Sequence, residues 1–258
     1  MVISSIISHP RVSNLNLGTC IKIGASSGVI ASLVFVFAYQ TSSWPLIRSQ
    51  AISLIALALA GLFEVFWLFF RDPERVSNAD PSVILSPADG KIIYIREFKN
   101  GALPCPVKGR KNINIVEISK TDFLNQGDGY IFGINMSLLD VHVNRVPMGG
   151  VVVFLKHTPG GLVSLKNWAS ETENVRNTTI IRKGDCSIAV IQIGSKFVSK
   201  IRCYIKENAT LTRGGRLGKI TFGSQVDLII PKKYLGEVLA YEGQQVYAGL
   251  TPLAAMNY

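Results

Sequence analysis

Two long apolar segments dominate the first part of the 258-residue chain. Residues 23–39 contain no charge over 17 positions, and residues 51–70 contain only Glu64 over 20 positions. About 20 apolar residues in a helix cross the roughly 30 Å hydrocarbon core of a bilayer. The second segment has this length, and the snorkelling stem of Lys22 extends the first. The pattern therefore predicts a two-helix transmembrane hairpin with spans at about 21–39 and 51–70.

The segment between the two predicted spans contains an interfacial aromatic residue, Trp44, and a helix breaker, Pro45. Basic residues near the spans predict the orientation, because loops rich in Lys and Arg stay in the cytoplasm. The connector has only Arg48, whereas the outer flanks carry four basic residues: Arg11, Lys22, Arg71 and Arg75. This pattern places the downstream domain on the cytoplasmic side of the cell membrane. A cleaved signal peptide and a monotopic hairpin are the alternatives.

After residue 83 the pattern changes to short runs rich in β-branched residues and bounded by Gly, Pro, Asn or Asp. Such runs are typical of strands. The clearest predicted strands are residues 91–97, 112–119, 150–156, 187–194, 200–207 and 225–231. Helix is expected only as one turn at the start of residues 137–144. We therefore expect a membrane hairpin in residues 1–75, followed by a compact soluble domain that is mainly β (α+β) in residues 76–258.

Charge and cysteine content narrow the choice of partners. The net charge is +10, of which residues 1–70 carry +2 and the rest +8. A basic domain favours anionic partners, either acidic lipid headgroups or nucleic acid, although a generic basic surface gives the same count. No nucleic-acid motif is present, and the adjacent membrane segments favour lipid. The four cysteines form no CxxC pair and the three histidines lack metal-ligand spacing, so no metal site or disulfide framework is expected.

Two segments of the predicted domain each contain a polar residue that could have either a structural or a catalytic role. In LSPADGKI (85–92), Asp89 precedes a glycine, where an aspartate most often caps a turn. In LLDVHVNRVPMGG (138–150), His142 lies among apolar residues, where a lone histidine is more often structural than catalytic. Either residue alone therefore favours the structural interpretation.

A third segment, KITFGSQVDLIIP (219–231), places Gly223 and Ser224 inside a strand-like run. A glycine within a strand usually marks a bulge or a close backbone approach. The chemical alternative is that the Ser224 hydroxyl attacks the Gly223 carbonyl, which no Cβ obstructs. Asp, His and Ser together are the parts that orient a base, take a proton and supply a nucleophile. No GxSxG elbow is present, so an ordinary hydrolase triad is not indicated.

Five segments occur in order along the chain: FFRDPER (69–75), SPADG (86–90), DVHVNRVP (140–147), FGS (222–224) with VDLIIP after it, and GQQVYAGLTPLA (243–254). In this combination the chain resembles the phosphatidylserine decarboxylase family, in its short form with an N-terminal membrane hairpin. The resemblance covers about residues 60–258. It implies a pyruvoyl-dependent lyase of phospholipid biosynthesis that is made as a self-cleaving zymogen.

The resemblance implies a sequence of covalent steps at Gly223 and Ser224. Ser224 attacks the Gly223 carbonyl, and elimination followed by loss of ammonia leaves a pyruvoyl group. The products are a β chain, residues 1–223, and an α chain, residues 224–258, which form a heterodimer; further oligomerisation stays open. The covalent pyruvoyl group is the implied cofactor, without pyridoxal phosphate or metal. It forms a Schiff base with the serine headgroup amine and takes up the electrons left by CO₂.

The resemblance also implies roles for the remaining candidate residues. Asp89 orients His142, which activates Ser224 and later acts as the general acid that returns a proton. Longer family members have a second histidine where this chain has Arg145. His142 therefore serves both steps, or another residue assists; His157 is the only other downstream histidine.

The predicted function is decarboxylation of phosphatidylserine to phosphatidylethanolamine at an anionic phospholipid membrane, with no nucleic-acid partner. One alternative is an archaetidylserine decarboxylase, because ether and ester lipids share this headgroup. A pyruvoyl-dependent decarboxylase of a soluble amino acid is disfavoured by the hairpin. A different class is a membrane-tethered, lipoyl-like β binding module, suggested by residues 236–254, which lack the exposed turn lysine of a swinging arm.

Overall fold

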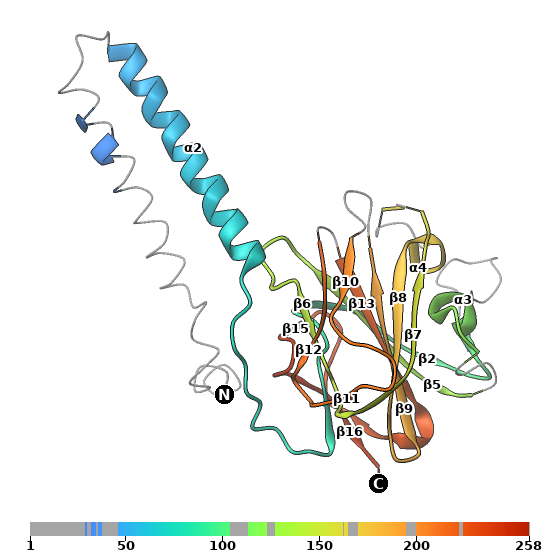
Figure 1. Ribbon diagram of the computed structural model, residues 1–258. Helices are drawn as coiled ribbons and strands as arrows, with labels where there is room; N and C mark the ends of the chain where they lie inside the picture. The colour runs from blue at the N-terminus through green and yellow to red at the C-terminus, as the bar shows by residue number, and fades with distance from the viewer. Residues whose placement is uncertain are drawn as a thin grey trace. The chain divides into compact units, whose positions relative to one another are not determined.

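The computed structural model describes residues 29, 32–34, 36–37, 46–103, 113–122, 127–161, 163–164, 170–194, 200–221 and 224–257. The chain forms two compact units, Met1–Phe70 and Arg71–Tyr258 (Figure 1). The predicted span at 21–39 lies mostly outside the described residues, so the two-helix hairpin stays a prediction.

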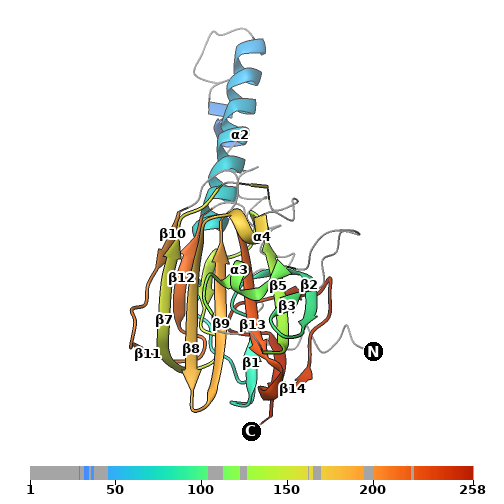
Figure 2. The same cartoon turned by 90° about the vertical axis from the view of Figure 1, so that its right-hand side faces the viewer.

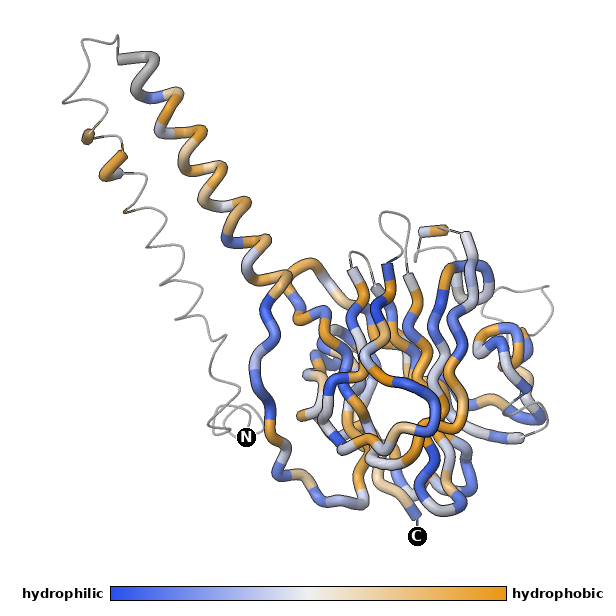
Figure 3. Tube along the Cα trace, in the orientation of Figure 1, coloured by the Kyte–Doolittle hydropathy of each residue, from blue (hydrophilic) through white to orange (hydrophobic). Residues whose placement is uncertain are grey.

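The first unit contains one long described helix, α2 (Leu46–Phe70). Its part from Gln50 to Phe70 is long and apolar enough to cross a membrane, which agrees with the predicted span at 51–70. Figure 3 shows hydrophobic residues along most of this helix. Its leucines and phenylalanines are largely exposed, which is unfavourable in water but not in lipid.

The second unit is mostly β with a few short helices, as the sequence predicts at this level (Figures 1 and 2). Its first strands are β1 (Val83–Leu85), β2 (Gly90–Phe98), β3 (Ala102–Leu103), β4 (Ile113–Asn114), β5 (Gly129–Met136), β6 (Val143–Arg145), β7 (Gly150–Thr158) and β8 (Arg176–Lys183). They are followed by β9 (Cys186–Ile193), β10 (Ile201–Cys203), β11 (Thr210–Leu211), β12 (Arg216–Ile220), β13 (Ser224–Pro231), β14 (Leu235–Val238), β15 (Gln245–Val246) and β16 (Pro252–Met256). The helices are α3 (Ile115–Ser119), α4 (Ser170–Glu173) and the 3-10 helix η2 (Lys232–Tyr234).

The largest sheet has eight strands in the order β11-β7-β8-β9-β13-β5-β2-β15, and its strand pairs are antiparallel. Two three-stranded sheets, β10-β12-β6 and β1-β16-β14, contribute to the core on one face of it. The other face is covered by α3, with α4 on the same side (Figure 2). The domain therefore has a hydrophobic core on each face of the large sheet.

Strand β13 lies near the middle of this arrangement and is buried along its whole length. Side chains alternate between the two faces of a strand. Val226, Leu228 and Ile230 enter the core beneath the small sheets, whereas Ile229 enters the core beneath α3. Burial of both faces explains the apolar run at residues 228–231, while Ser224, Gln225 and Asp227 are polar residues buried in the same strand.

Three local predictions are wrong. Residues 112–119 form the short β4 and helix α3 rather than one strand. The Asn114 side chain accepts from Val116 N at the helix start, and Lys120 ends the helix in the left-handed conformation. Capping and burial of Ile115 and Ile118 thus outweigh the β propensity of the segment.

The other two errors concern residues 137–144 and 200–207. The single helical turn expected at the start of 137–144 is a non-helical turn that leads into β6, and β10 covers only the first part of the run at 200–207. By contrast, β2, β7, β9 and β13 lie within one or two residues of their predicted positions. Long apolar strands are thus predicted better than segments whose ends depend on turns.

Gly133 of β5 makes room for a buried hydrogen bond. In register it lies between Tyr94 of β2 and Asp227 of β13. The Tyr94 hydroxyl donates to Asp227 Oδ1 over 2.9 Å, and Gln225 Nε2 donates to both groups over 2.8 Å. The Tyr94 ring crosses above Gly133, where a Cβ would collide with it. The glycine is therefore needed for the ring to reach the buried carboxylate.

Gly133→Ala is expected to lower the free energy of unfolding by about 3 kcal/mol, because the methyl group displaces Tyr94 and weakens its bond to the buried Asp227. Urea unfolding of the full chain in detergent, followed by tryptophan fluorescence, measures the loss. Gly161→Ala is the matched control, since a Cβ there meets its nearest atom at 3.7 Å. Equal stability of the two variants would show that the Tyr94 ring does not need a glycine at position 133.

Candidate active site

Ser224 is the first residue of β13 and is completely buried. It pairs with Met136 of β5, and by alternation its side chain shares a face with Val226, towards the core beneath the small sheets. Its Oγ has no hydrogen-bond partner among the described residues. Gly223, the other half of the predicted cleavage site, lies outside the described residues. A buried hydroxyl without a partner is uncommon and calls for an explanation.

His142 lies at the same end of this core. Its carbonyl accepts from Ile220 N over 3.2 Å, four residues before Ser224. Two residues after His142, the Asn144 amide donates to the sulfur of Met136 over 3.7 Å, and Met136 is the register partner of Ser224. These two connections place the segments that carry His142 and Ser224 close together, and the roles of base and nucleophile stay a prediction.

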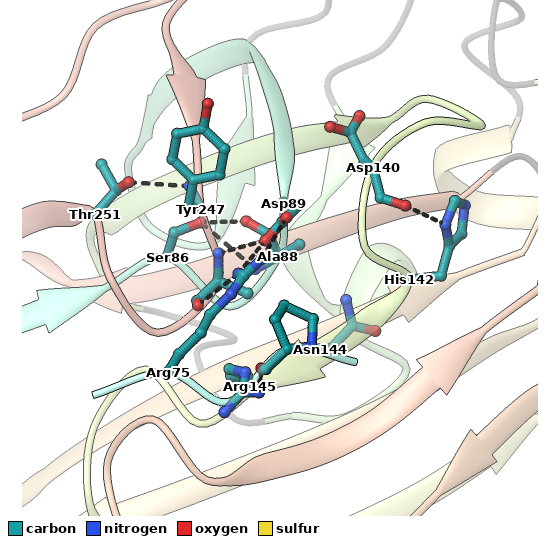
Figure 4. Close-up of polar contacts among 12 residues, drawn as sticks. Arg75, Ser86, Ala88, Asp89, Asp140, His142, Asn144, Arg145, Tyr247 and Thr251 are labelled. Carbon is teal, nitrogen blue, oxygen red and sulfur yellow. Dashed lines mark hydrogen bonds and ion pairs between the residues drawn. The ribbon is translucent and has the colours of Figure 1, made fainter. Parts of the chain in front are cut away.

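The imidazole of His142 is oriented by the backbone of its own turn. Nδ1 lies 2.8 Å from the carbonyl oxygen of Asp140 (Figure 4). A carbonyl oxygen only accepts, so Nδ1 carries the hydrogen and the basic lone pair of the neutral ring lies on Nε2. Burial lowers the pKa of His142, while the bond to Asp140 and the charges of Asp140 and Asp89 partly oppose this effect. The neutral, basic form is therefore favoured.

Asp89 has a different partner from the one that the resemblance implies. Both of its oxygens bind the guanidinium of Arg75, and Oδ1 also accepts from Ala248 N over 2.8 Å (Figure 4). This ion pair is almost completely buried, a setting in which either charge alone is costly. The hydrogen bond that orients His142 thus comes from Asp140 rather than Asp89, which acts on the ring through its charge.

Arg145 has a structural role. Longer members of the family that the sequence resembles have a histidine at this position. The Arg145 guanidinium donates to the Pro73 carbonyl over 2.7 Å and to the Gly214 carbonyl over 2.9 Å, and it lies 3.2 Å from Asp72. A guanidinium stays protonated and cannot act as a base. Arg145 therefore fastens residues 72–73 to the domain and does not replace the missing histidine.

His157 is too far away to act directly on Ser224. It lies on β7, which is separated from β13 by β8 and β9. Three strand spacings correspond to about 14 Å. The side chain of His157 is also exposed, so it is unlike the buried groups around Ser224. Of the two histidines considered, the structure places only His142 near Ser224.

A buried amide network on the Ser224 face was not predicted. Gln192 of β9 donates to Asn144 over 2.7 Å and accepts from Asn177 of β8 over 3.2 Å. Gln192 pairs in register with Val226, two residues along β13 from Ser224. The available signal was Gln192, a single polar residue in the otherwise apolar run 188–193 of β9. Arg75 was also missed as the partner of Asp89, because no spacing rule connects residues that meet only after folding.

This geometry supports nucleophilic chemistry by a serine hydroxyl. A buried hydroxyl lies in the same neighbourhood as a neutral imidazole whose tautomer is fixed. Such a pair can transfer a proton from Oγ to Nε2 as the oxygen attacks a carbonyl. Among the described residues, no three His, Cys, Asp or Glu side chains gather as a metal site would require.

Comparison with known proteins identifies the family. The sequence model of the family described as phosphatidylserine decarboxylase matches residues 62–254. A protein of Methanocaldococcus jannaschii, provisionally named an archaetidylserine decarboxylase proenzyme, is 39% identical over 202 residues, which cover 78% of this chain and 93% of that protein. The phosphatidylserine decarboxylase proenzyme of Granulibacter bethesdensis is 32% identical over 227 residues, covering 83% of this chain and 85% of that protein. The chain therefore belongs to the phosphatidylserine decarboxylase family.

Proposed function

We propose that this chain is a proenzyme that cleaves itself between Gly223 and Ser224 and then decarboxylates the serine headgroup of a phospholipid. The observation that carries the proposal is the completely buried Ser224 Oγ, which lacks a hydrogen-bond partner among the described residues at the start of the central strand. Leaving a buried hydroxyl unpaired costs about 1–3 kcal/mol, so it needs a functional reason. The name proenzyme, carried by the relatives from both archaea and bacteria, supports it.

Self-cleavage begins when Ser224 Oγ attacks the carbonyl carbon of Gly223 and His142 Nε2 takes the hydroxyl proton. The C–N bond then breaks, and the Ser224 nitrogen receives a proton, which leaves an ester. Loss of the α-hydrogen of residue 224 expels the Gly223 carboxylate and forms dehydroalanine. Water then replaces the nitrogen, which leaves as ammonia. The products are the β chain, residues 1–223, and the α chain, residues 224–258.

The site fits a pyruvoyl group at position 224. Ser224 is buried on the face that carries Met136 and Val226, so bulk water is excluded from that position. The ladder that β13 forms with β5 begins at Ser224 itself, which holds the new chain end after cleavage. When present, the pyruvoyl group would supply an electron-poor carbonyl and an adjoining amide as the electron sink, without pyridoxal phosphate or metal.

During decarboxylation the protein has two tasks. The apolar surroundings of residue 224 disfavour a carboxylate relative to neutral CO₂. His142 is neutral in the resting site, so it first accepts at Nε2 a proton that the substrate ammonium group loses on binding, and then gives this proton to the α-carbon of the product. Asp140 preserves the ring orientation through both transfers, because its carbonyl holds Nδ1.

The substrate supports a membrane location. A lipid-spanning α2, paired with the predicted first span at 21–39 as a hairpin, would keep the domain at the surface of the cell membrane on the cytoplasmic side. The charge of +8 outside the first 70 residues favours an anionic phospholipid surface. A diacyl substrate then reaches the site without leaving the bilayer.

Ser224→Ala is expected to leave the precursor as one 258-residue chain, because the variant lacks the attacking oxygen. Wild-type protein should give two fragments, and its 35-residue α chain should resist Edman sequencing and weigh one ammonia less than a peptide that begins with serine. Intact-mass analysis measures both. Ser187→Ala on the neighbouring strand β9 is the control and should cleave normally. An active wild-type enzyme that remains one chain would refute the proposal and favour the binding-module alternative.

The rate of self-cleavage is expected to depend on pH through His142. A base acts in its neutral form, and burial lowers the pKa of His142 below the ordinary value of about 6.5. The rate should therefore be constant above about pH 6.5 and fall only as the pH drops through the lowered pKa. Precursor made by cell-free synthesis in nanodiscs and transferred to buffers between about pH 4.5 and 8 tests this. An inflection above the ordinary value would contradict the assignment of His142 as the base.

The names of the relatives indicate two classes of lipid substrate, and activity on the two can be compared. One is named for archaetidylserine and another for phosphatidylserine, and the two names share the serine headgroup. Because the proposed chemistry takes place at the headgroup, mature enzyme should release CO₂ from both ester-linked and ether-linked lipids. The ratio of the two kcat/KM values assigns the physiological class. Release of CO₂ from free serine at a comparable kcat/KM would instead favour a soluble substrate.

A further inference from the structure

The turn that joins β5 to β6 exposes two adjacent leucines beside the candidate active site. Leu138 and Leu139 are 52% and 54% exposed. The turn is well ordered by hydrogen bonds, since Asp140 N donates to the Ser137 carbonyl over 3.1 Å and Ser137 N donates to Asp140 Oδ2 over 2.7 Å. Gln245 adds a bond to Asp140 Oδ1 over 3.1 Å. The hydrogen bonds of the turn therefore keep the two leucine side chains exposed to solvent and out of the core.

An exposed leucine alone is common on soluble proteins and indicates no partner. The partner is indicated by Arg71, whose Nη2 donates to the carbonyl of Leu139 over 2.7 Å. Arg71 directly follows Phe70, the last residue of the apolar segment Gln50–Phe70. The leucine tip is thus hydrogen-bonded to the residue that directly follows a helix able to cross a bilayer. If that helix end lies at the membrane surface, the tip lies there too.

The same turn is connected to the chemistry. The carbonyl of Asp140, the residue after Leu139, holds Nδ1 of His142. We propose that the Leu138–Leu139 tip inserts into the interfacial layer of the bilayer and so brings a lipid headgroup to His142 and Ser224. Delivery of a headgroup to these two residues by the contact rests on the proposed function. The contact itself depends only on the exposed leucines and on the hydrogen bond from Arg71, the residue that follows α2, to the Leu139 carbonyl.

The activity test compares two substrates in the same proteoliposomes. Leu138→Ser combined with Leu139→Ser should lower turnover of long-chain phosphatidylserine in the bilayer by roughly tenfold, because two half-exposed leucines lose their apolar contact with lipid. Turnover of a short-chain phosphatidylserine, added below its micelle concentration, should be unchanged. Val151→Ser combined with Leu239→Ser removes two exposed apolar side chains elsewhere and should affect neither substrate. An equal loss on both substrates, or no loss on either, would overturn the proposal.

A second measurement is independent of catalysis and so separates this proposal from the proposed function. Leu139→Cys, labelled with the fluorophore NBD in a chain whose native cysteines are replaced by serine, should show NBD fluorescence that shifts to the blue on reconstitution and is quenched by spin-labelled lipid. The same label at position 151 should do neither. Absence of quenching at position 139 would overturn the proposal even in an active enzyme. A blue shift in detergent that grows with protein concentration would overturn it too, because a second copy would then cover the leucines.

Discussion

The pairing of β13 on both of its edges is the constraint on which the rest of the structure depends. It forms a continuous ladder with β5 from Ser224 to Pro231, and a second ladder with β9 from Gln225 to Ile229. Both of its faces are buried. A break in the chain immediately before such a strand leaves the new end held by hydrogen bonds and packing. The fold can therefore tolerate cleavage at a position where most proteins would lose a strand.

The group that orients the His142 ring differs from the one that the family resemblance implies. Asp89 is bound by Arg75 and affects His142 only through its charge, as the smallest of the causes that shift the pKa of His142. The orientation of the ring instead comes from a backbone carbonyl, which carries no charge and keeps the same position at every pH. An imidazole held in this way stays neutral over a wider range than one paired with a free carboxylate. This arrangement suits a base that has no second histidine beside it.

The sequence predicted the features that depend on composition along one segment. The apolar length of residues 51–70, the mainly β domain and the long strands follow from hydrophobic pattern. The pairs that depend on the folded chain were not predictable: Arg75 meets Asp89 across 14 positions, and Gln192 meets Asn144 across 48. Helix α3 was missed because its caps and its core contacts decide its conformation, not the propensity of its β-branched residues.

Two consecutive carbonyls in the turn between β5 and β6 connect Arg71, the residue that follows α2, with the imidazole. Leu139 O accepts from Arg71, and Asp140 O holds His142. Both bonds use the backbone, whereas the proposed contact with lipid uses only the leucine side chains. Loss of those side chains should therefore leave the ring in place, and the membrane contact can be varied without changing the chemistry. The turn is braced on two sides, by the bond between Ser137 and Asp140 and by Gln245, so the Asp140 carbonyl keeps its position independently of the leucine side chains.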